Sequence, residues 1–347
     1  IFSVQLDEDK LKERIESLFN TSSIQKKIKI EEDNCNLDKN NCIGLLTGPI
    51  FSTNYIIGKE LSTSIAVSGV NNINILSKVT KGTKDNYNTM NSGENAAFGI
   101  FQADIIKELL INNKTREFNT KNKTSIICQL YTSEFHIFSN KINKTIFDLN
   151  DKLISIGEAD NNSQETAKIF FKELGVKIKN YIIEISITDA LVNTLCGRSD
   201  ALFIVDAKPS TIFQLLYKLK EESVYRNLTN EFHFIPISEE NFNSLTEKYK
   251  DCYKKSQISY QDYKWLDDKF VVPTIAVKSF MFGFNFDRYN SEYGLNRCRQ
   301  LNIIFDHVRK NINTFNHPKW KELIIDHQDL NLNWININFN KCIFSYY

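Results

Sequence analysis

The chain has 347 residues, a formal net charge of +1 and 41% hydrophobic residues, among them 25 Phe and 14 Tyr. At roughly 150 residues per domain this length predicts two domains, and the apolar content excludes a wholly disordered chain. The near-neutral charge argues against nucleic acid or an anionic membrane surface as the main partner, and no apolar run reaches the ~20 residues of a membrane-spanning helix.

Residues 1–40 form a polar and charged N-terminal segment. Within it, Leu6, Leu11, Ile15 and Phe19 recur at helical spacing, which predicts one amphipathic helix. The Glu and Lys residues between them favour a solvated opposite face. We therefore expect an N-terminal extension that packs on the first domain and takes no part in a site.

From residue 42 onward, short apolar segments alternate with segments of helical pattern. The first run predicts strands at 43–47, 64–70 and 96–101, and helices at 55–61, 72–79 and from residue 105. A second run, after residue 140, predicts strands at 153–157, 182–187 and 201–205, and helices at 164–174 and 190–196. Strands that alternate with helices indicate an α/β fold with parallel sheets covered on both faces.

Two extended stretches, 126–139 and 270–284, are suited to carry the chain from one α/β run to the other and back. The helix-rich segment from residue 293 would then complete the first domain. The resulting division is an N-terminal extension at 1–40, a first lobe at 41–137 with 270–347, and a second lobe at 138–269. Two α/β lobes joined by two crossing strands form a central cleft, where such folds bind ligands.

The seven cysteines contain no CxxC pair, and no histidine lies at zinc-ligand spacing from them, so we expect no structural metal site. Cys35 and Cys42 flank a polar segment and either close a small disulfide loop or remain two unpaired thiols. Cys128 and Cys196 lie in apolar surroundings, where a free thiol packs as a small hydrophobe. An odd number leaves at least one thiol free unless it pairs between chains.

Residues that could carry catalysis are few. GxSxG, P-loop and HExxH motifs are absent, and no Cys or Ser near the five histidines matches a nucleophile motif. His136 lies within an apolar run, which favours a core or hinge position over a catalytic base. Paired carboxylates such as Asp267 and Asp268 lie in polar segments and are expected at the surface. We therefore expect no enzymatic activity, no cofactor and no metal.

The loops between strands and helices are more informative. Gly48 opens one such loop, and Ser52, Thr53, Asn54 and Tyr55 follow it at the start of a helix. The backbone N–H groups and the positive dipole end of a helix N-terminus favour a carboxylate or a similar anion. These five residues are therefore expected to contact a ligand. The alternative is that Ser52 and Thr53 only cap the helix.

The second run holds an equivalent loop, in which Asn161, Asn162 and Ser163 precede a helix. Two helix N-termini of this kind can hold an anionic ligand from both sides; for Ser163 the alternative is again capping alone. In the first run, Gln102 follows a strand, where its amide can donate to a carboxylate and accept from an amino group. Its alternative role is to tie down its own loop.

Several short motifs follow one another along the chain. Residues 46–58 have the form TGP…Y…G, and residues 91–104 read NSGENAAFGIFQAD. The next segments are LYTSEFH at 130–136 and a block at 148–175. They are followed by DAL, DALF and KPS, all within residues 189–210, and by a tyrosine-rich segment at 249–277 that ends in VPTIAV. This order, over residues 42–335, resembles that of the TAXI family, the extracytoplasmic solute-binding proteins of tripartite ATP-independent periplasmic (TRAP) transporters.

The chain departs from the family pattern in both loops. Ser52 and Thr53 stand where the family has Gly-Gly, and Asn161, Asn162 and Ser163 stand where it has GSGT. The lining is therefore bulkier and more polar, and pocket shape and hydrogen-bond partners decide which ligand fits.

The resemblance implies a two-lobe periplasmic-binding-protein fold of type II that captures a small carboxylate or amino acid, such as glutamate. It also implies delivery of this solute to the membrane permease subunits of a TRAP transporter. The protein is then expected to be a periplasmic monomer whose signal peptide was removed before Ile1. Two other interpretations stay open: an enzyme on the same two-lobe scaffold, and a degenerate protein kept for surface interactions.

Charge gives one further expectation about the ligand. The loops contain no arginine, and Lys208, just after the strand at 201–205, is the cation best placed to face the cleft; the alternative is a solvated lysine. Glu158 and Asp160 would repel a dianion unless they point away or pair with Lys208. Recognition by helix N-termini, hydroxyls and amides, with an acidic side chain for an amino group, therefore favours a zwitterionic amino acid over a simple dicarboxylate.

Overall fold

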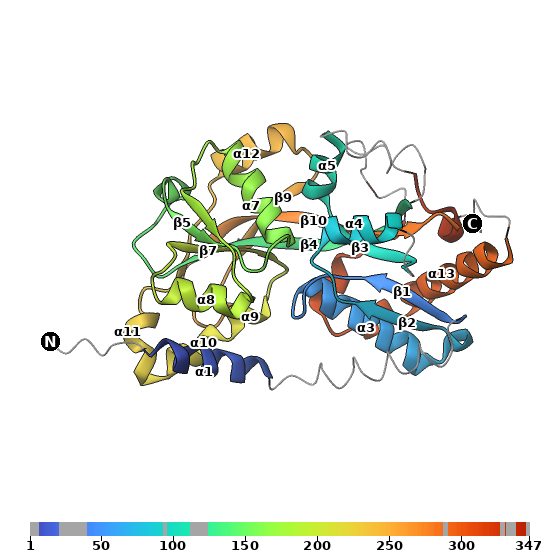
Figure 1. The fold of residues 1–347 in the computed structure, drawn as a ribbon, viewed down its shortest axis with the longest axis horizontal. Coiled ribbons are helices and arrows are strands. Elements are labelled where there is room, and N and C mark those ends of the chain that lie inside the picture. Colours follow the sequence, from blue (N-terminus) through green and yellow to red (C-terminus); the bar gives the residue numbers. More distant parts are fainter. Residues whose placement is uncertain are drawn as a thin grey trace. The chain divides into compact units, whose positions relative to one another are not determined.

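The computed structural model describes residues 7–20, 40–92, 96–111, 124–286, 291–326, 330 and 338–344. The chain forms two compact units: residues 23–132 with 278–347, which we call the first unit, and residues 1–22 with 133–277, the second unit. Both combine strands and helices, so the predicted α/β class is confirmed. The unit boundaries lie inside two long strands, β4 (Thr124–Ser139) and β10 (Val272–Phe284), which are the two expected crossing strands (Figure 1). The lobe limits expected at 137/138 and 269/270 stay predictions.

The first unit is built on a sheet with strand order β2-β1-β3-β10. Its parallel strands are β1 (Cys42–Leu46), β2 (Asn74–Lys78) and β3 (Phe98–Gln102), and β10 pairs antiparallel to β3. Its helices are α3 (Thr53–Ser68), α4 (Thr83–Ser92), α5 (Ala103–Ile111), α13 (Glu292–Asn311) and α14 (Lys341–Phe344), with 3-10 turns at Val70–Asn72, Ile312–Thr314 and Pro318–Glu322. The chain passes from β1 through α3 to β2 in one direction across the sheet, and from β2 through α4 to β3 in the other direction. Because such crossovers are right-handed, α3 and α4 cover opposite faces of the sheet (Figure 1).

The second unit has the strand order β4-β7-β5-β6. β5 (Leu153–Ser155) is parallel to β6 (Asn180–Ile182) and β7 (Ala201–Asp206), while β4 is antiparallel to β7 and to β8 (His233–Phe234), and β9 (Tyr253–Ile258) is antiparallel to β10. The helices are α1 (Glu8–Asn20), α7 (Asn162–Glu173), α8 (Ile187–Leu195), α9 (Thr211–Gln214), α10 (Leu216–Glu221), α11 (Arg226–Thr229) and α12 (Glu239–Lys248), with 3-10 turns at Ile146–Leu149 and Ser223–Tyr225. As in the first unit, α7 and α8 lie on opposite faces of the sheet (Figure 1).

The two units repeat one connection, β1-α3-β2-α4-β3 in the first and β5-α7-β6-α8-β7 in the second. Backbone hydrogen bonds at the carboxyl ends of the strands correspond as well. Thr80 N donates to Gly48 O at 3.2 Å, and Glu184 N donates to Gly157 O at 2.9 Å. Each glycine opens the loop that leads to the next helix. Gly48 and Gly157 are therefore equivalent positions, and so are Thr80 and Glu184.

Two elements predicted in the first unit are wrong. The strand expected at 64–70 lies mostly within α3, and the helix expected at 72–79 is mostly β2. Leu61 and Ile65 are one helical turn apart and fully buried, so the apolar residues of this stretch belong to a helix face. In β2 buried positions such as Ile75 alternate with less buried ones, which is the pattern of a strand.

In the second unit, β6 ends earlier than the strand predicted at 182–187. Ile183 and Ile185 suggested a buried strand, but they are 52% and 91% exposed. Apolar identity alone therefore misplaced this strand, because the chain has already left the sheet and is approaching α8.

Within the described ranges, no helix is both long enough and apolar enough to cross a bilayer.

Helix α1 packs on the second unit, which corrects the expectation that it packs on the first domain. Its apolar stripe, Leu11 and Ile15, is fully buried, and the helix contacts α8. At the edge of this contact Lys12 Nζ lies 2.6 Å from Asp189 Oδ1. The stripe was correctly placed on one helix face, but the periodicity of α1 carries no information about which unit receives it.

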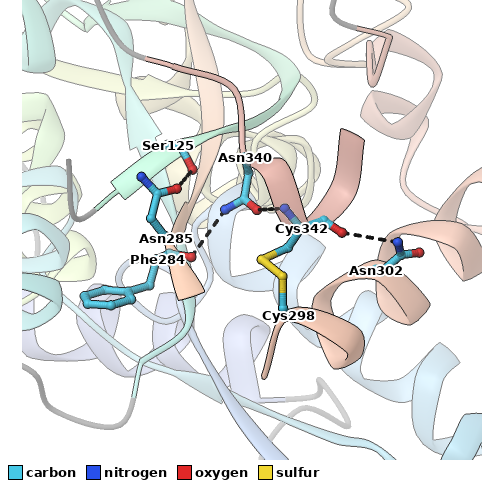
Figure 2. Close-up of a disulfide and its surroundings, with 7 residues drawn as sticks. All are labelled: Ser125, Phe284, Asn285, Cys298, Asn302, Asn340 and Cys342. Carbon is cyan, nitrogen blue, oxygen red and sulfur yellow. Dashed lines mark hydrogen bonds between the residues drawn. A yellow bond between two sulfur atoms is a disulfide. The ribbon is translucent and has the colours of Figure 1, made fainter. Parts of the chain in front are cut away.

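A disulfide fixes the C-terminal segment of the first unit. Figure 2 shows Cys298 of α13 bonded to Cys342 of α14. Beside it, Asn340 Nδ2 donates to Phe284 O at 3.3 Å, and Asn340 Oδ1 accepts from Cys342 N at 3.1 Å. From α13, Asn302 Nδ2 donates to Cys342 O at 3.2 Å. The covalent bond and these hydrogen bonds tie α14 to both α13 and the end of β10.

The other cysteines follow the expectations in part. Cys42 is disulfide-bonded, whereas Cys35, its expected partner, lies outside the described residues. Cys128 and Cys252 are buried and form no disulfide, and Cys196 is half-buried and also forms none. Burial raises the pKa of Cys196 to about 11, so this thiol stays protonated and poorly nucleophilic near neutral pH.

Candidate functional site

The loop from β1 to α3 folds tightly on Gly48. A Cβ atom at this position would lie 3.0 Å from Ser52 Oγ and 3.3 Å from Asn54 Cβ. Ser52 is the N-cap of α3: its Oγ accepts from Tyr55 N at 3.3 Å and donates to Pro49 O at 2.7 Å. The structure thus brings four of the predicted residues into one compact turn and gives Ser52 the capping role that the sequence left open.

The side chains of the first turn of α3 point in different directions. Asn54 Oδ1 accepts a hydrogen bond from the hydroxyl of Tyr131 on β4. Thr53 is buried. Tyr55 is fully buried and lines a separate pocket of about 410 Å³, between the outer face of α3 and residues 314–316. Phe315 also lines this pocket and stacks on Trp320, with ring centroids 4.2 Å apart.

Gln102, at the end of β3, is engaged with its own loop. Its Nε2 donates to Asp104 Oδ1 at 2.8 Å, and its backbone N donates to Thr83 Oγ1 at 2.9 Å. Asp104 Oδ1 also accepts from Ile105 N at 2.8 Å, so the same carboxylate caps the start of α5. These bonds hold the Gln102 amide in place beside the end of β3.

Sequence reasoning missed Asn86 on α4. Its Nδ2 donates to Thr47 O at 3.0 Å and to Ile100 O at 2.7 Å, which joins the ends of β1 and β3. The side chain is fully buried, and Oδ1 receives no hydrogen bond. No local pattern could have marked Asn86, because its partners lie 39 and 14 residues away in the sequence.

The loop from β5 to α7 repeats the capped arrangement. Asn161 is the N-cap: its Oδ1 accepts from Gln164 N at 2.7 Å, and its Nδ2 donates to Ile156 O at 3.1 Å. Asn162 begins α7, and Ser163 Oγ accepts from Val205 N at 3.0 Å, which ties α7 to the end of β7. The three predicted residues of this loop therefore lie together at the carboxyl ends of the strands.

Lys208 lies after β7 and is held by groups of its own unit. Its Nζ lies 3.2 Å from Asp262 Oδ2 and donates to Gln257 O, and its backbone N donates to Glu134 Oε2 at 3.0 Å. Lys208 therefore forms its ion pair with Asp262, whereas pairing with Glu158 or Asp160 was one of two alternatives that the sequence left open. Paired in this way, Lys208 offers less positive charge to a ligand than a solvated lysine would.

Glu184, two residues after β6, is a second residue that sequence reasoning missed. Its carboxylate accepts from Ser155 Oγ at 2.5 Å, Gly157 N at 3.1 Å and Asn193 Nδ2 at 3.3 Å. The residue is 8% exposed. Burial raises the pKa of Glu184, although these hydrogen bonds favour the ionised form. The signal in the sequence was a single acidic residue within the apolar run 181–185.

His136 lies in the core, as expected. Its Nδ1 donates to Glu134 O at 3.0 Å, since a carbonyl oxygen can only accept, and its Nε2 shares a hydrogen bond of 2.7 Å with the Tyr263 hydroxyl. That hydroxyl accepts from Ser210 N at 2.8 Å. The ring also stacks on Phe213, 5.0 Å between centroids. His136 is therefore a hydrogen-bonded core residue that holds the segment after β7 in place through Tyr263.

The other histidines of the described chain also have structural partners. His307 Nε2 lies 2.9 Å from Ser64 Oγ, His233 Nε2 lies 2.6 Å from Asn143 O, and His317 N donates to Glu60. His327 lies outside the described residues. Among the residues that the structure describes, no group of three or more His, Cys, Asp or Glu side chains is arranged to hold a metal ion.

Comparison with known proteins gives one family and several distant structures. No curated protein sequence matches the chain. Solved structures similar to it include a periplasmic transporter (9% identity, 81% of this chain and 85% of that chain, TM-score 0.47) and the substrate-binding protein of an amino acid ABC transporter (13%, 81% and 96%, 0.40). A third is the GluR0 ligand-binding core from Nostoc punctiforme in complex with L-glutamate (12%, 81% and 95%, 0.42).

The family comparison is more extensive: the model of the NMT1-like family matches residues 45–285, which is more than half of the chain and includes all the loops described above. The chain belongs to the NMT1-like family.

Proposed function

We propose that the protein is a solute-binding protein that captures a small carboxylate or amino acid without converting it. The observation that carries this proposal is the junction repeated in both units, in which a strand ends, a glycine opens the loop and a side-chain cap starts a helix. It occurs at Gly48, Ser52 and α3, and again at Gly157, Asn161 and α7. A helix N-terminus at the carboxyl end of a parallel strand favours a bound anion.

The proposed ligand contacts are the predicted residues at these strand ends. They are Gly48, Ser52, Thr53, Asn54 and Gln102 of the first unit and Asn161, Asn162 and Ser163 of the second. Tyr55 and Lys208 belong to the same proposal, but they would have to leave their present surroundings, the pocket behind α3 and the ion pair with Asp262. The two α/β lobes with two crossing strands suit a type II binding protein that closes on its ligand.

We further propose that the protein works outside the cytoplasm and delivers its solute, as a monomer, to TRAP permease subunits. The motif order from residue 46 to residue 277 supports the TAXI subfamily. The disulfide between Cys298 and Cys342 and the disulfide-bonded Cys42 support an oxidising compartment, because such bonds rarely persist in a reducing cytoplasm. Uptake of radiolabelled solute by vesicles that contain the permease should require the purified protein.

A thermal-shift and calorimetry panel tests the binding function. The panel contains L-glutamate, L-glutamine, 2-oxoglutarate and succinate, and a ligand at 100 times its Kd should stabilise the protein by about 2.7 kcal/mol. We expect at least one saturable ligand that is recovered chemically unchanged. Conversion of the compound would favour an enzyme on this scaffold, and the absence of any shift across a broad metabolite panel would favour a degenerate interaction protein.

A further inference from the structure

Glu184 is a buried acidic side chain with neutral partners. Its carboxylate accepts hydrogen bonds from one hydroxyl, one side-chain amide and one backbone N–H, those of Ser155, Asn193 and Gly157. Among the described residues, no Lys, Arg or His forms an ion pair with it, and the largest contributions to its altered acidity are burial and hydrogen bonds to neutral groups. Buried carboxylates are normally paired with a cation, so this one is electrostatically incomplete.

The neutral groups around Glu184 supply hydrogen bonds but no positive charge. Ser155, Gly157 and Asn193 donate to its carboxylate, and the backbone of Ile156 also favours the ionised form. Burial raises the pKa of Glu184, which means that the ionised form lacks stabilisation that a cation would provide. An ammonium group is a small cation with three donors, and it supplies the missing positive charge through a charge-assisted hydrogen bond.

The position of Glu184 places it at the loop that holds the proposed ligand contacts. Glu184 and Gly157 exchange two hydrogen bonds: Glu184 N donates to Gly157 O at 2.9 Å, and Gly157 N donates to Glu184 Oε2 at 3.1 Å. Asn161, the cap of α7, is anchored to Ile156 O in the same loop. Ligands of α/β sheets bind at these carboxyl ends of strands. A cation at Glu184 would therefore lie beside the N-terminus of α7, which favours the opposite charge.

The equivalent position in the first unit has a related character. Thr80, whose backbone N bonds to Gly48 O as Glu184 N does to Gly157 O, has a buried hydroxyl with no hydrogen-bond partner. Both units thus place a polar side-chain oxygen two residues after the second strand of the repeat. In the second unit this oxygen belongs to a carboxylate.

We propose that Glu184 receives the positively charged amino group of the ligand and so selects amino acids over simple dicarboxylates. The proposal rests on the proposed solute-binding function and names the specificity residue of that site. A ligand with both charges would place its carboxylate at the N-terminus of α7 and its ammonium at Glu184. Glu158 and Asp160, which the sequence offered for this role, are then not required.

The test compares L-glutamate with glutarate, which lacks only the amino group, by isothermal titration calorimetry. We expect the wild-type protein to bind L-glutamate at least about tenfold more tightly than glutarate. Glu184→Gln, which keeps the shape and can still bond to Ser155 and Gly157, should remove this preference by weakening L-glutamate while glutarate stays equal or improves. Glu184→Asp keeps the charge and should retain part of the preference.

Glu165→Gln is the matched control, because Glu165 lies in the first turn of α7 and pairs with Lys168 at 3.4 Å. It removes the same charge from the same region and should leave the preference unchanged. An unchanged L-glutamate preference in folded Glu184→Gln, or a wild-type protein that binds glutarate as well as L-glutamate, overturns the proposal and leaves the solute-binding function standing. A wild-type protein that binds no solute overturns both.

Discussion

His317 is a partly buried imidazole whose surroundings disfavour a positive charge. Burial, and then the neighbouring Lys319, lower the pKa of His317 to about 4, while Nδ1 accepts from Lys319 N at 3.3 Å. In the unfolded chain the pKa is near ~6.5, so the unfolded state binds the proton more tightly. The contribution of His317 to the free energy of unfolding is therefore fully present above pH ~6.5 and is lost as the pH falls from there toward about 4.

Replacement of His317 by Asn should flatten this acid response, because Asn also caps a helix start and does not titrate. The pKa difference corresponds to at most ~3 kcal/mol, reduced by the partial exposure of the ring. Urea unfolding of both proteins at a series of pH values between neutrality and mild acid measures the effect. Stability curves that stay parallel over this range would show that His317 does not contribute.

Some residues of the candidate site can be predicted from the neighbouring sequence, and others cannot. Ser52 and Asn161 were found because small polar residues before a helix are typical of its N-terminus, but the cap in the second unit is Asn161 and not Ser163, which lies within α7. Asn86 and Glu184 were missed because their partners come from distant strands. Lys208 was recognised as a cation near a strand end, but its ion pair with Asp262 depends on a residue 54 positions away.

At the scale of the element, the start of α3 allows capping to be separated from ligand contact. Ser52→Asp should keep the protein within ~0.5 kcal/mol of wild-type stability, because Asp caps helices as well as Ser does. Its negative charge should nevertheless weaken carboxylate binding by about tenfold if the ligand lies at this N-terminus. Chemical unfolding and calorimetry measure the two effects.

Ser52→Ala serves as the control, since it removes the cap and should cost about 1 kcal/mol of stability. Unchanged ligand affinity in Ser52→Asp, combined with lost stability in Ser52→Ala, would assign Ser52 to capping alone.

Elements were predictable where one signal dominated. Short apolar runs marked β1, β3 and β7, and small polar residues at the helix start marked α3 and α7. The stretch 64–70 was misassigned because its small and β-branched residues also suit a strand, and only packing of Ile65 against the core settles its helical state. The docking of α1 on α8 depends on tertiary contacts, which the amphipathic pattern does not encode.

At the scale of the whole molecule, the Cys298–Cys342 bond should account for a large share of the stability of the first unit. It links residues 44 positions apart, and the chain-entropy account of such a crosslink gives about 4 kcal/mol. We expect the double variant Cys298→Ser and Cys342→Ser to lose stability of this order in denaturant unfolding, with the loss confined to the first unit.

Cys196→Ser, which changes a half-buried free thiol of the second unit, is the control and should change stability by less than ~1 kcal/mol. A double variant as stable as the wild type would show that the hydrogen bonds of Asn340 and Asn302 suffice to hold α14.

The Cys298–Cys342 disulfide also determines how the recombinant protein has to be produced. A recombinant copy made in the cytoplasm of a standard bacterial host would emerge from the ribosome with seven thiols and no oxidant to pair them. Cys128 and Cys252 become inaccessible only once their surroundings have folded, so during refolding in air they compete with the correct partners. Export to an oxidising compartment, or refolding in a glutathione redox buffer followed by a thiol count, should therefore precede every binding measurement.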